Sequence, residues 1–457
     1  MTDIITSINP ATGAQIAEYK IDNEQKVERV LKAADKAYEE WRSTSFRERS
    51  AVLKRIAKAL KRNKKWLAEL ATAEMGKPIE QSIGEVEKCA MNMEFYAKNG
   101  PGFIADEIVK TEASKSYVSY QPLGVVLAIM PWNFPYWQVF RAMGPILMAG
   151  NVMVLKHASN VSGCARAMEK ILKEADVPKG LFQALLVPGA QVEPIIKHQA
   201  IAAVTLTGST EAGKKVAAVA GAHIKKQVLE LGGSDAYIVL KDADMQLAVD
   251  LCVRGRLYNS GQSCVCAKRF IVEKAVRKEF EQKMTEQMEA SAFGDPMDKS
   301  NRIGPLARID LRDELHKQVQ ESIKKGAKLL CGGYIPEGDG AYYPPTVLTN
   351  VKKGMPAYDE ELFGPVAAII EAKDEEHAIK LANDSIYGLG GGIFSKNVKK
   401  AEKIAATQIQ AGNCFVNAFV HSDPRLPFGG VKQSGYGREL SMFGIREFTN
   451  VKTVFIK

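Results

Sequence analysis

Three short apolar runs, each followed by a helix-like pattern, set the strongest limit on how this chain can fold. They are Leu123–Met130, Asn151–Lys156 and Ala202–Thr207, and apolar residues lie on both of their faces. A strand of this kind is buried on both sides, as in a parallel sheet covered by helices. Parallel strands joined by helices need right-handed crossovers, and they place ligands at the carboxyl edge of the sheet. The sequence therefore predicts an α/β domain with a binding site at that edge.

A second series of strand and helix patterns begins after Gly233. Upstream of the first series, residues 23–106 carry apolar side chains at helical spacing, interrupted near Gly76–Pro78. We expect the boundary between the two α/β units at Glu230–Ser234, and a cleft between such units is a usual place for a site. The strands expected in the second unit are Ala236–Leu240, Arg269–Val272, Ala327–Leu330, Ala367–Ile370 and Gly391–Phe394.

Composition narrows the class of protein. A chain of 457 residues is long enough for two or three domains, and 46% hydrophobic with 25% charged residues is typical of a soluble globular protein. No apolar run is long enough to cross a bilayer, and the first residues lack the pattern of a signal peptide. The seven cysteines are scattered and odd in number. They indicate reduced thiols, and we expect a cytoplasmic protein without a membrane partner.

The net charge of +9 could indicate a nucleic-acid-binding protein, whose binding would depend steeply on salt. However, the lysines are interspersed with glutamates along helical segments, and the densest basic run, Lys61–Lys65, lies opposite an apolar helix face. We interpret it as a solvated surface and expect no nucleic-acid partner. No metal site is expected either, because the pair Cys264 and Cys266 lacks a second pair and no histidine lies near it in sequence.

One thiol and one carboxylate occupy positions that suit chemistry. Cys264 lies in a small, polar, glycine-containing turn just before the strand-like Phe270–Val272, and Glu230 lies in an apolar stretch that ends in Gly232 and Gly233. Most free cysteines are small buried hydrophobes, and Cys264 could be one of them. Its polar surroundings favour the other interpretation, a nucleophile with Glu230 as its base.

Two segments carry a resemblance to a known family. Asn259–Cys264 and Leu229–Gly233 resemble the two signature motifs of the aldehyde dehydrogenase superfamily, in that family's order and spacing. The resemblance extends over essentially the whole chain, and bacterial succinate-semialdehyde dehydrogenases are the most similar group. It implies a Rossmann-like cofactor domain (residues 1–114 and 122–232), a catalytic domain (233–432) and a small β arm (115–121 and 445–457) that forms a homodimer or homotetramer.

The resemblance also implies a reaction. Cys264 would add to an aldehyde to give a thiohemiacetal, loss of hydride to NAD(P)+ would leave a thioester, and Glu230 would activate water to hydrolyse it. Burial should raise the pKa of Glu230 enough for this role, and the two following glycines would let it move. Asn133 is the family's side-chain donor to the oxyanion, beside the Cys264 amide. From the residues alone, Asn133 could equally be a turn residue or a helix cap.

The cofactor segment departs from the usual dinucleotide fingerprint, since the chain has no Gly-x-Gly-x-x-Gly. Instead Gly208 and Ser209 follow a strand, and Ser209 could begin a helix whose amides face a phosphate. Ser159 stands where NAD-preferring relatives commonly have a glutamate, so a 2′-phosphate would meet no repulsion there, and we expect NADP to be used at least as well as NAD. By resemblance the remaining cofactor-binding residues are Trp132, Lys156, Glu361 and Phe363.

The expected substrate is a small aldehyde with a distal carboxylate. If a helix begins at Phe134, then Phe134, Trp137 and Arg141 share one face with residue 138, and about 10 Å separates its ends at 1.5 Å per residue. Arg141 would clamp the carboxylate, with Trp137 beside it. Alternatively, Arg141 is paired with a structural acid. Ser422, in the loop that closes the family's pocket, could add a second donor.

Several alternatives stay open. Cys266 is either inert core or a partner that traps oxidised Cys264 as a disulfide. The enzyme could act on another small aldehyde, charged or uncharged. A cysteine acyltransferase or hydrolase could also use Cys264 and Glu230 without nicotinamide.

Overall fold

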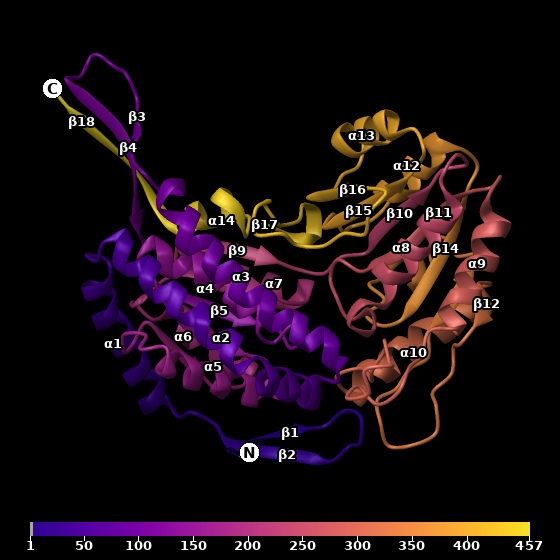
Figure 1. Ribbon diagram of the computed structural model, residues 1–457, viewed down its shortest axis with the longest axis horizontal. Helices are drawn as coiled ribbons and strands as arrows, with labels where there is room; N and C mark the ends of the chain where they lie inside the picture. Colours follow the sequence, from indigo (N-terminus) through magenta and orange to yellow (C-terminus); the bar gives the residue numbers. More distant parts are fainter. Residues whose placement is uncertain (1–2) are drawn as a thin grey trace.

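The computed structural model describes residues 3–457, and they form two α/β halves, a projecting arm and a terminal hairpin (Figure 1). The predicted α/β fold with two mainly parallel sheets is confirmed. The chain passes from one large sheet to the other between Glu230 and Asp235. Among residues 3–457, no helix combines the length and apolar character that crossing a bilayer requires.

The first large sheet has the order β17-β9-β8-β5-β6-β7 and is parallel except for the short edge strand β17. The three apolar runs that predicted it are β5, β6 and β8, and their side chains join one continuous core. Strands β7 and β17 were not predicted, whereas the apolar stretch that contains Glu230 forms β9. The strands are β5 Val125–Met130, β6 Val152–His157, β7 Phe182–Leu185, β8 Ile201–Thr207, β9 Lys226–Glu230 and β17 Gly435–Tyr436, and the helices are α4 Trp137–Ala149, α5 Ser162–Glu174, α6 Val192–Lys197 and α7 Thr210–Ala222.

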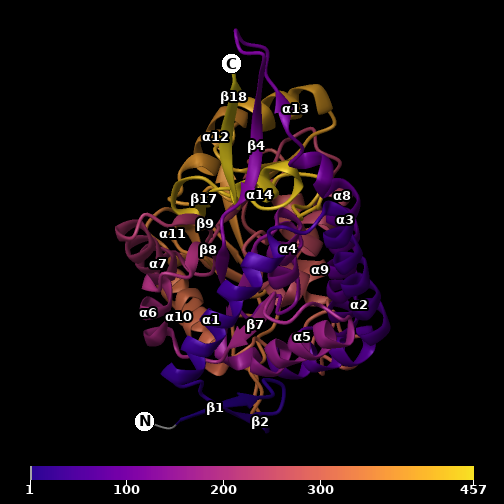
Figure 2. The same ribbon diagram turned by 90° about the vertical axis from the view of Figure 1, so that its left-hand side faces the viewer.

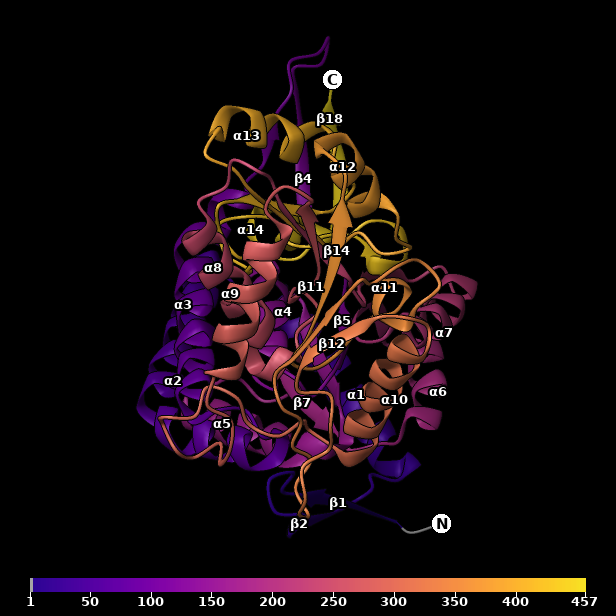
Figure 3. The same cartoon turned by 90° about the vertical axis from the view of Figure 1, so that its right-hand side faces the viewer.

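The second large sheet has the order β12-β13-β14-β11-β10-β15-β16, and only β12 runs antiparallel to its neighbour. Alternate residues of β11 enter different cores: Phe270 packs with α8 and α9, and Ile271 packs with α10 to α13. Figure 3 shows α9 on one side of β11 and β14 and α10 and α11 on the other. The strands are β10 Asp235–Val239, β11 Ala267–Glu273, β12 Lys328–Cys331, β13 Thr346–Thr349, β14 Val366–Ala372, β15 Gly390–Phe394 and β16 Asn413–Val416; the helices are α8 Met245–Leu257, α9 Arg277–Glu289, α10 Ile309–Lys324, α11 Pro356–Asp359, α12 Glu375–Asn383 and α13 Val398–Thr407.

Three long helices precede the first sheet, with β1 (Ile4–Ile8) and β2 (Gln15–Lys20) forming a hairpin ahead of them. The predicted break is confirmed, because Gly76 ends a helix in the left-handed conformation with φ +76°. A second break was not predicted: Ser45 forms a capping box with Glu48 and starts a new helix. The helices are α1 Glu24–Trp41, α2 Phe46–Met75 and α3 Ile79–Phe103.

A three-stranded antiparallel sheet projects from the first half (Figure 2). The chain's last strand, β18 (Thr449–Ile456), pairs along β4 (Lys115–Pro122), and β3 (Glu107–Ile108) adds to the other edge. The predicted strand character of the tail is confirmed. Helix α14 (Ser441–Glu447) leads into β18. Several apolar side chains on β18 are exposed, among them Val451, Phe455 and Ile456.

Candidate active site

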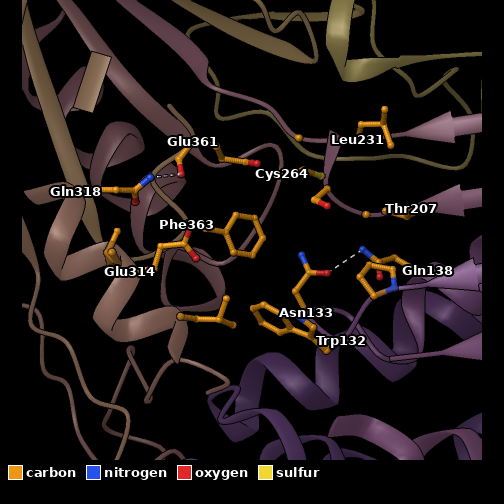
Figure 4. Close-up of a pocket in the computed structure, with 16 residues that line it drawn as sticks. Trp132, Asn133, Gln138, Thr207, Leu231, Cys264, Glu314, Gln318, Glu361 and Phe363 are labelled. Carbon is orange, nitrogen blue, oxygen red and sulfur yellow. Dashed lines mark hydrogen bonds between the residues drawn. The ribbon is translucent and has the colours of Figure 1, made fainter. Parts of the chain in front are cut away.

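Cys264 lies where two cavities meet. The Phe363 cavity, of about 290 Å³, is also lined by Trp132, Asn133 and Glu361 (Figure 4). The Trp137 cavity, of about 320 Å³, opens on the other side of the thiol. Both cavities share only Cys264 and Gln138 among their lining residues. A compound in either cavity can therefore reach the sulfur, which suits a reaction between two bound molecules.

The backbone before Cys264 is strained and held in place by buried side chains. Asn259, Ser260 and Gly261 have left-handed backbone conformations with φ of 53°, 54° and 75°. Residues other than glycine rarely adopt this conformation. A Cβ on Gly261 would lie 2.2 Å from a backbone oxygen, so only glycine fits there. The Asn259 amide donates to the Asn133 carbonyl at 2.7 Å, and Arg256 donates to the Gly261 carbonyl at 2.6 Å. This network fixes the turn that presents the thiol.

Lys268, at the start of β11, links the nucleophile loop to the Phe363 cavity. Its fully buried ammonium donates to the Ser263 and Cys264 carbonyls at 2.9 and 2.6 Å, and it pairs with Glu361 at 3.2 Å. Burial raises the pKa of the Cys264 thiol to about 12, and Lys268 is the main charge that opposes this rise. A base must therefore take the proton when the sulfur reacts. The role of Lys268 was not predicted, because a lysine in a strand pattern carries no signal of its own.

The side-chain amide of Asn133 lines the Phe363 cavity together with Cys264, and it is hydrogen-bonded to the side-chain amide of Gln138. Gln138 Nε2 donates to Asn133 Oδ1 at 3.0 Å (Figure 4). Asn133 Nδ2 donates one hydrogen to the Gln262 carbonyl at 3.0 Å. The first bond fixes the orientation of the amide group, and the second leaves one N–H hydrogen free. That hydrogen can serve an oxygen in the cavity. Gln138 was not singled out from sequence, although it lies on the helix face noted there.

Glu230 is the last residue of β9. Its side chain is buried, and it is not among the residues that line either cavity. Within residues 3–457, neither of its carboxylate oxygens has a hydrogen-bond partner. Burial raises its pKa well above the ordinary value, and the neighbouring Glu439 carboxylate raises it further, against Arg141 and Arg438. The predicted upward pKa shift is confirmed, and the contribution of Glu439 was not foreseen.

Arg141 forms a buried ion pair with Glu439, with 2.5 Å between Nη2 and Oε2. The same nitrogen donates to Thr207 at 3.1 Å, and the guanidinium lies over the Phe428 ring. This is the structural pairing that the sequence left open as an alternative. Arg141 nevertheless lines the Trp137 cavity, and among residues 3–457 its Nη1 atom has no hydrogen-bond acceptor.

The helix that carries Arg141 starts later than expected. Helix α4 begins at Trp137, not at Phe134, because the Tyr136 and Trp137 amides both donate to the buried Glu85 carboxylate at 2.8 Å, which completes the helix end. The shared face is still present, since residues 134, 137, 138 and 141 all line the Trp137 cavity. Ser422 also lines it, from the loop after β16.

The remaining predicted residues divide between the cavity and the sheet edge. Trp132 and Phe363 form an edge-to-face pair, 5.7 Å between ring centroids, in the Phe363 cavity. Gly208 and Ser209 line it as well, and Ser209 caps α7 by accepting from the Ala212 amide, as predicted. In contrast, Lys156 and the exposed Ser159 lie at the carboxyl end of β6 and do not line this cavity.

Cys266 lines neither of the two cavities. It is 2% exposed, and its thiol donates to the Tyr258 carbonyl at 3.4 Å. These surroundings favour the interpretation of Cys266 as core.

Comparison with known proteins gives a consistent picture. Residues 2–454 match the model of the aldehyde dehydrogenase family. The chain is 48% identical to a succinate semialdehyde dehydrogenase [NAD(P)+] of Escherichia coli, over 98% of this chain and 97% of that one. It is 46% identical to a probable succinate-semialdehyde dehydrogenase [NADP(+)] of Synechocystis, over 99% of each. Among solved structures, the succinic semialdehyde dehydrogenase of Streptococcus pyogenes with NADP+ superposes with a TM-score of 0.97 at 38% identity, over 99% of each chain.

Proposed function

The chain belongs to the aldehyde dehydrogenase family, and we propose that it oxidises succinate semialdehyde to succinate with NADP+ or NAD+. The observation that carries the proposal is the position of Cys264 between two cavities, one for each reactant. The names of its relatives, which are succinate-semialdehyde dehydrogenases, support this substrate and these cofactors.

The reaction begins when the Cys264 thiol loses its proton to a base and its sulfur bonds to the aldehyde carbon. The carbonyl oxygen becomes an oxyanion, and the free hydrogen on Asn133 Nδ2 and the Cys264 amide stabilise it. Because Gln138 fixes Asn133 in advance, the donor needs no reorientation during the reaction. One such donor typically lowers the barrier by about 3 kcal/mol.

The residues around the Phe363 cavity fit a nicotinamide dinucleotide. A Cβ on Gly208 would touch protein atoms only at 3.7 Å or more, so the protein itself does not require glycine there and the bare backbone can approach a phosphate. Trp132 and Phe363 offer aromatic faces, and Glu361 offers a carboxylate for ribose hydroxyls. When bound, the oxidised nicotinamide would accept the hydride that the tetrahedral carbon releases.

The adenosine end of the nicotinamide cofactor would lie along the carboxyl edge of β6. Lys156 and Ser159 end this strand and begin the turn after it. Neither residue carries negative charge, so a 2′-phosphate would meet a lysine and a hydroxyl there. This arrangement supports NADP use at least equal to that of NAD.

Glu230 would act last, by taking a proton from the water that hydrolyses the Cys264 thioester. To do so it must rotate from its buried position toward the sulfur. Since no described residue is hydrogen-bonded to its carboxylate oxygens, rotation breaks no such bond within the protein. The neighbouring Gly232 and Gly233 have no side chains that would block the movement, and Gly233 already packs against the Cys264 carbonyl.

The carboxylate of the substrate would lie in the Trp137 cavity, against Arg141 and Ser422. Arg141 keeps Nη1 available although Nη2 is paired with Glu439, and Trp137 forms an apolar wall for the short carbon chain. We further propose that the cofactor domain comprises residues 1–114 and 122–232, the catalytic domain residues 233–432, and the arm residues 115–121 and 445–457. The exposed apolar side chains of β18 support an arm that joins subunits into a homodimer or homotetramer.

A panel of aldehydes assayed with NADP+ and with NAD+ tests the proposal. Absorbance of the reduced cofactor should appear with succinate semialdehyde. The KM for this substrate should be lower than the KM for uncharged aldehydes of equal length. Hydrolysis of thioesters without any reduced cofactor would instead identify a hydrolase. The seven free cysteines support a cytoplasmic location.

A further inference from the structure

We propose that Lys88 of helix α3 binds the anionic end of the substrate together with Ser422, so that the Trp137 cavity selects short aldehydes with a distal carboxylate. The inference rests on the proposed oxidation at Cys264 and assigns the group that recognises the substrate's tail.

Lys88 reaches into the Trp137 cavity from the helical layer. Its ammonium donates to Ser422 Oγ at 2.8 Å and lies 4.2 Å from the centroid of the Trp137 ring. Ser422 accepts through its oxygen here, so its own hydrogen remains free to donate. Lys88 and Ser422 are therefore two neighbouring donors that can bind one carboxylate in the cavity, and the Trp137 ring packs against the Lys88 ammonium.

The charges that line this cavity do not balance. Glu85 is bonded by Lys77, Arg141 is paired with Glu439, and Asp423 is paired with Arg425. Two lining cations are left over, Lys88 and Arg254, and among residues 3–457 neither forms an ion pair with a carboxylate. An anionic ligand is the group that would complete the set.

The two unpaired cations differ in position. Arg254 is exposed and lies over the Phe419 ring, where it can attract an anion at the entrance. Lys88 is half-buried, and burial lowers its pKa to about 8, with Arg141 adding to the effect. A carboxylate beside Lys88 would stabilise its charged form. Arg141 alone is less suited to this task, because Glu439 already neutralises much of its charge.

Kinetics with two matched substrates test the inference. Lys88→Met should raise KM for succinate semialdehyde about thirtyfold or more, since a partly buried charge loses its partner. The same variant should leave KM for the uncharged methyl ester of succinate semialdehyde unchanged, and Lys88→Arg should restore most of the selectivity. Lys98→Met, on an exposed turn of the same helix, should behave as wild type with both substrates.

Equilibrium binding of succinate keeps the inference separate from the proposed function. Calorimetry should show succinate binding to the wild type and Lys98→Met and much weaker binding to Lys88→Met, whether or not the protein turns over. The inference would be overturned if Lys88→Met raised KM equally for succinate semialdehyde and for its methyl ester. It would also be overturned if Lys88→Met left succinate binding unchanged. A wild type that oxidises neither aldehyde would instead overturn the proposed oxidation.

Discussion

Arg141 and Glu439 form a buried ion pair 2.5 Å apart, and both charges lie next to the unpaired carboxylate of Glu230. Burial raises the pKa of Glu439 and the Arg141 charge opposes that rise, while the Glu439 carboxylate adds to the raised pKa of Glu230. Arg141 thus borders the Trp137 cavity and also acts electrostatically on Glu230, the proposed base. Changes to this pair should affect stability, pH dependence and substrate binding together.

Removal of Arg141 alone should destabilise the protein. Arg141→Met leaves Glu439 buried without its partner, and breaking a buried pair in this way costs about 3–5 kcal/mol. The double variant Arg141→Met/Glu439→Gln should recover much of this loss, because no unpaired charge remains. Urea unfolding of the wild type, both single variants and the double variant measures the coupling, and strictly additive changes would mean that the pair contributes nothing.

The pH dependence of thioester hydrolysis should move when Glu439 is neutralised. Glu230 acts as a base only when deprotonated, so its raised pKa makes hydrolysis slow as the pH falls through that value. Glu439→Gln removes one cause of the increase and leaves the positive charge of Arg141 uncompensated. The acid limb should therefore shift to lower pH. Stopped-flow decay of the acyl-enzyme across pH measures the shift; Glu80→Gln, an exposed acid paired with Lys299, should give the wild-type profile.

Coenzyme preference should depend on residue 159. Ser159→Glu places a negative charge where the 2′-phosphate of NADP is proposed to lie, and like charges about 4 Å apart repel by about 1 kcal/mol in water and 4 kcal/mol near a protein surface. The ratio of kcat/KM for NADP to that for NAD should fall by a factor between about five and about nine hundred. Ser159→Gln, of equal size but uncharged, is the control, and an equal effect of both substitutions would mean that size and not charge decides.

Succinate affinity should fall between pH 7 and pH 9. Lys88 has its pKa lowered to about 8 and faces Glu85 and Cys89 on its own helix, Arg141 on α4 and Asp423 on the closing loop. Its ammonium is deprotonated as the pH rises through about 8, so the anion should bind about tenfold more weakly at pH 9. Calorimetric titrations with succinate measure this change. The weak residual binding of Lys88→Met should show no such dependence over the same range.

The local sequence pattern was sufficient to predict the two α/β units and to single out the Cys264 thiol. The runs that became β5, β6 and β8 are apolar on both faces because helices cover both sides of their sheet, and this signal is strong. Strands β13 and β16 were not predicted; each has four residues, and a run of that length shows little periodicity. The start of α4 was misplaced because its cap, Glu85, lies 51 residues earlier in the chain.

The residues that surround the reacting groups were harder to predict than the groups themselves. Lys88 and Glu439 read as ordinary charges on a helix and in a loop, and only the fold brings them to Trp137 and Arg141. Gln138 could have been found, because it shares a helix face with Trp137 and Arg141. Buried charges far apart in sequence leave no local pattern, so their pairing depends on tertiary structure.

Trapping the covalent intermediate tests the account most directly. Glu230→Gln should add its aldehyde and reduce one equivalent of NADP+ per active site, and then stop, because its amide cannot take a proton from water. Mass spectrometry of the enzyme quenched after that burst should find a succinyl group on the peptide that contains Cys264. Continued turnover with no acyl group on that peptide would contradict the account.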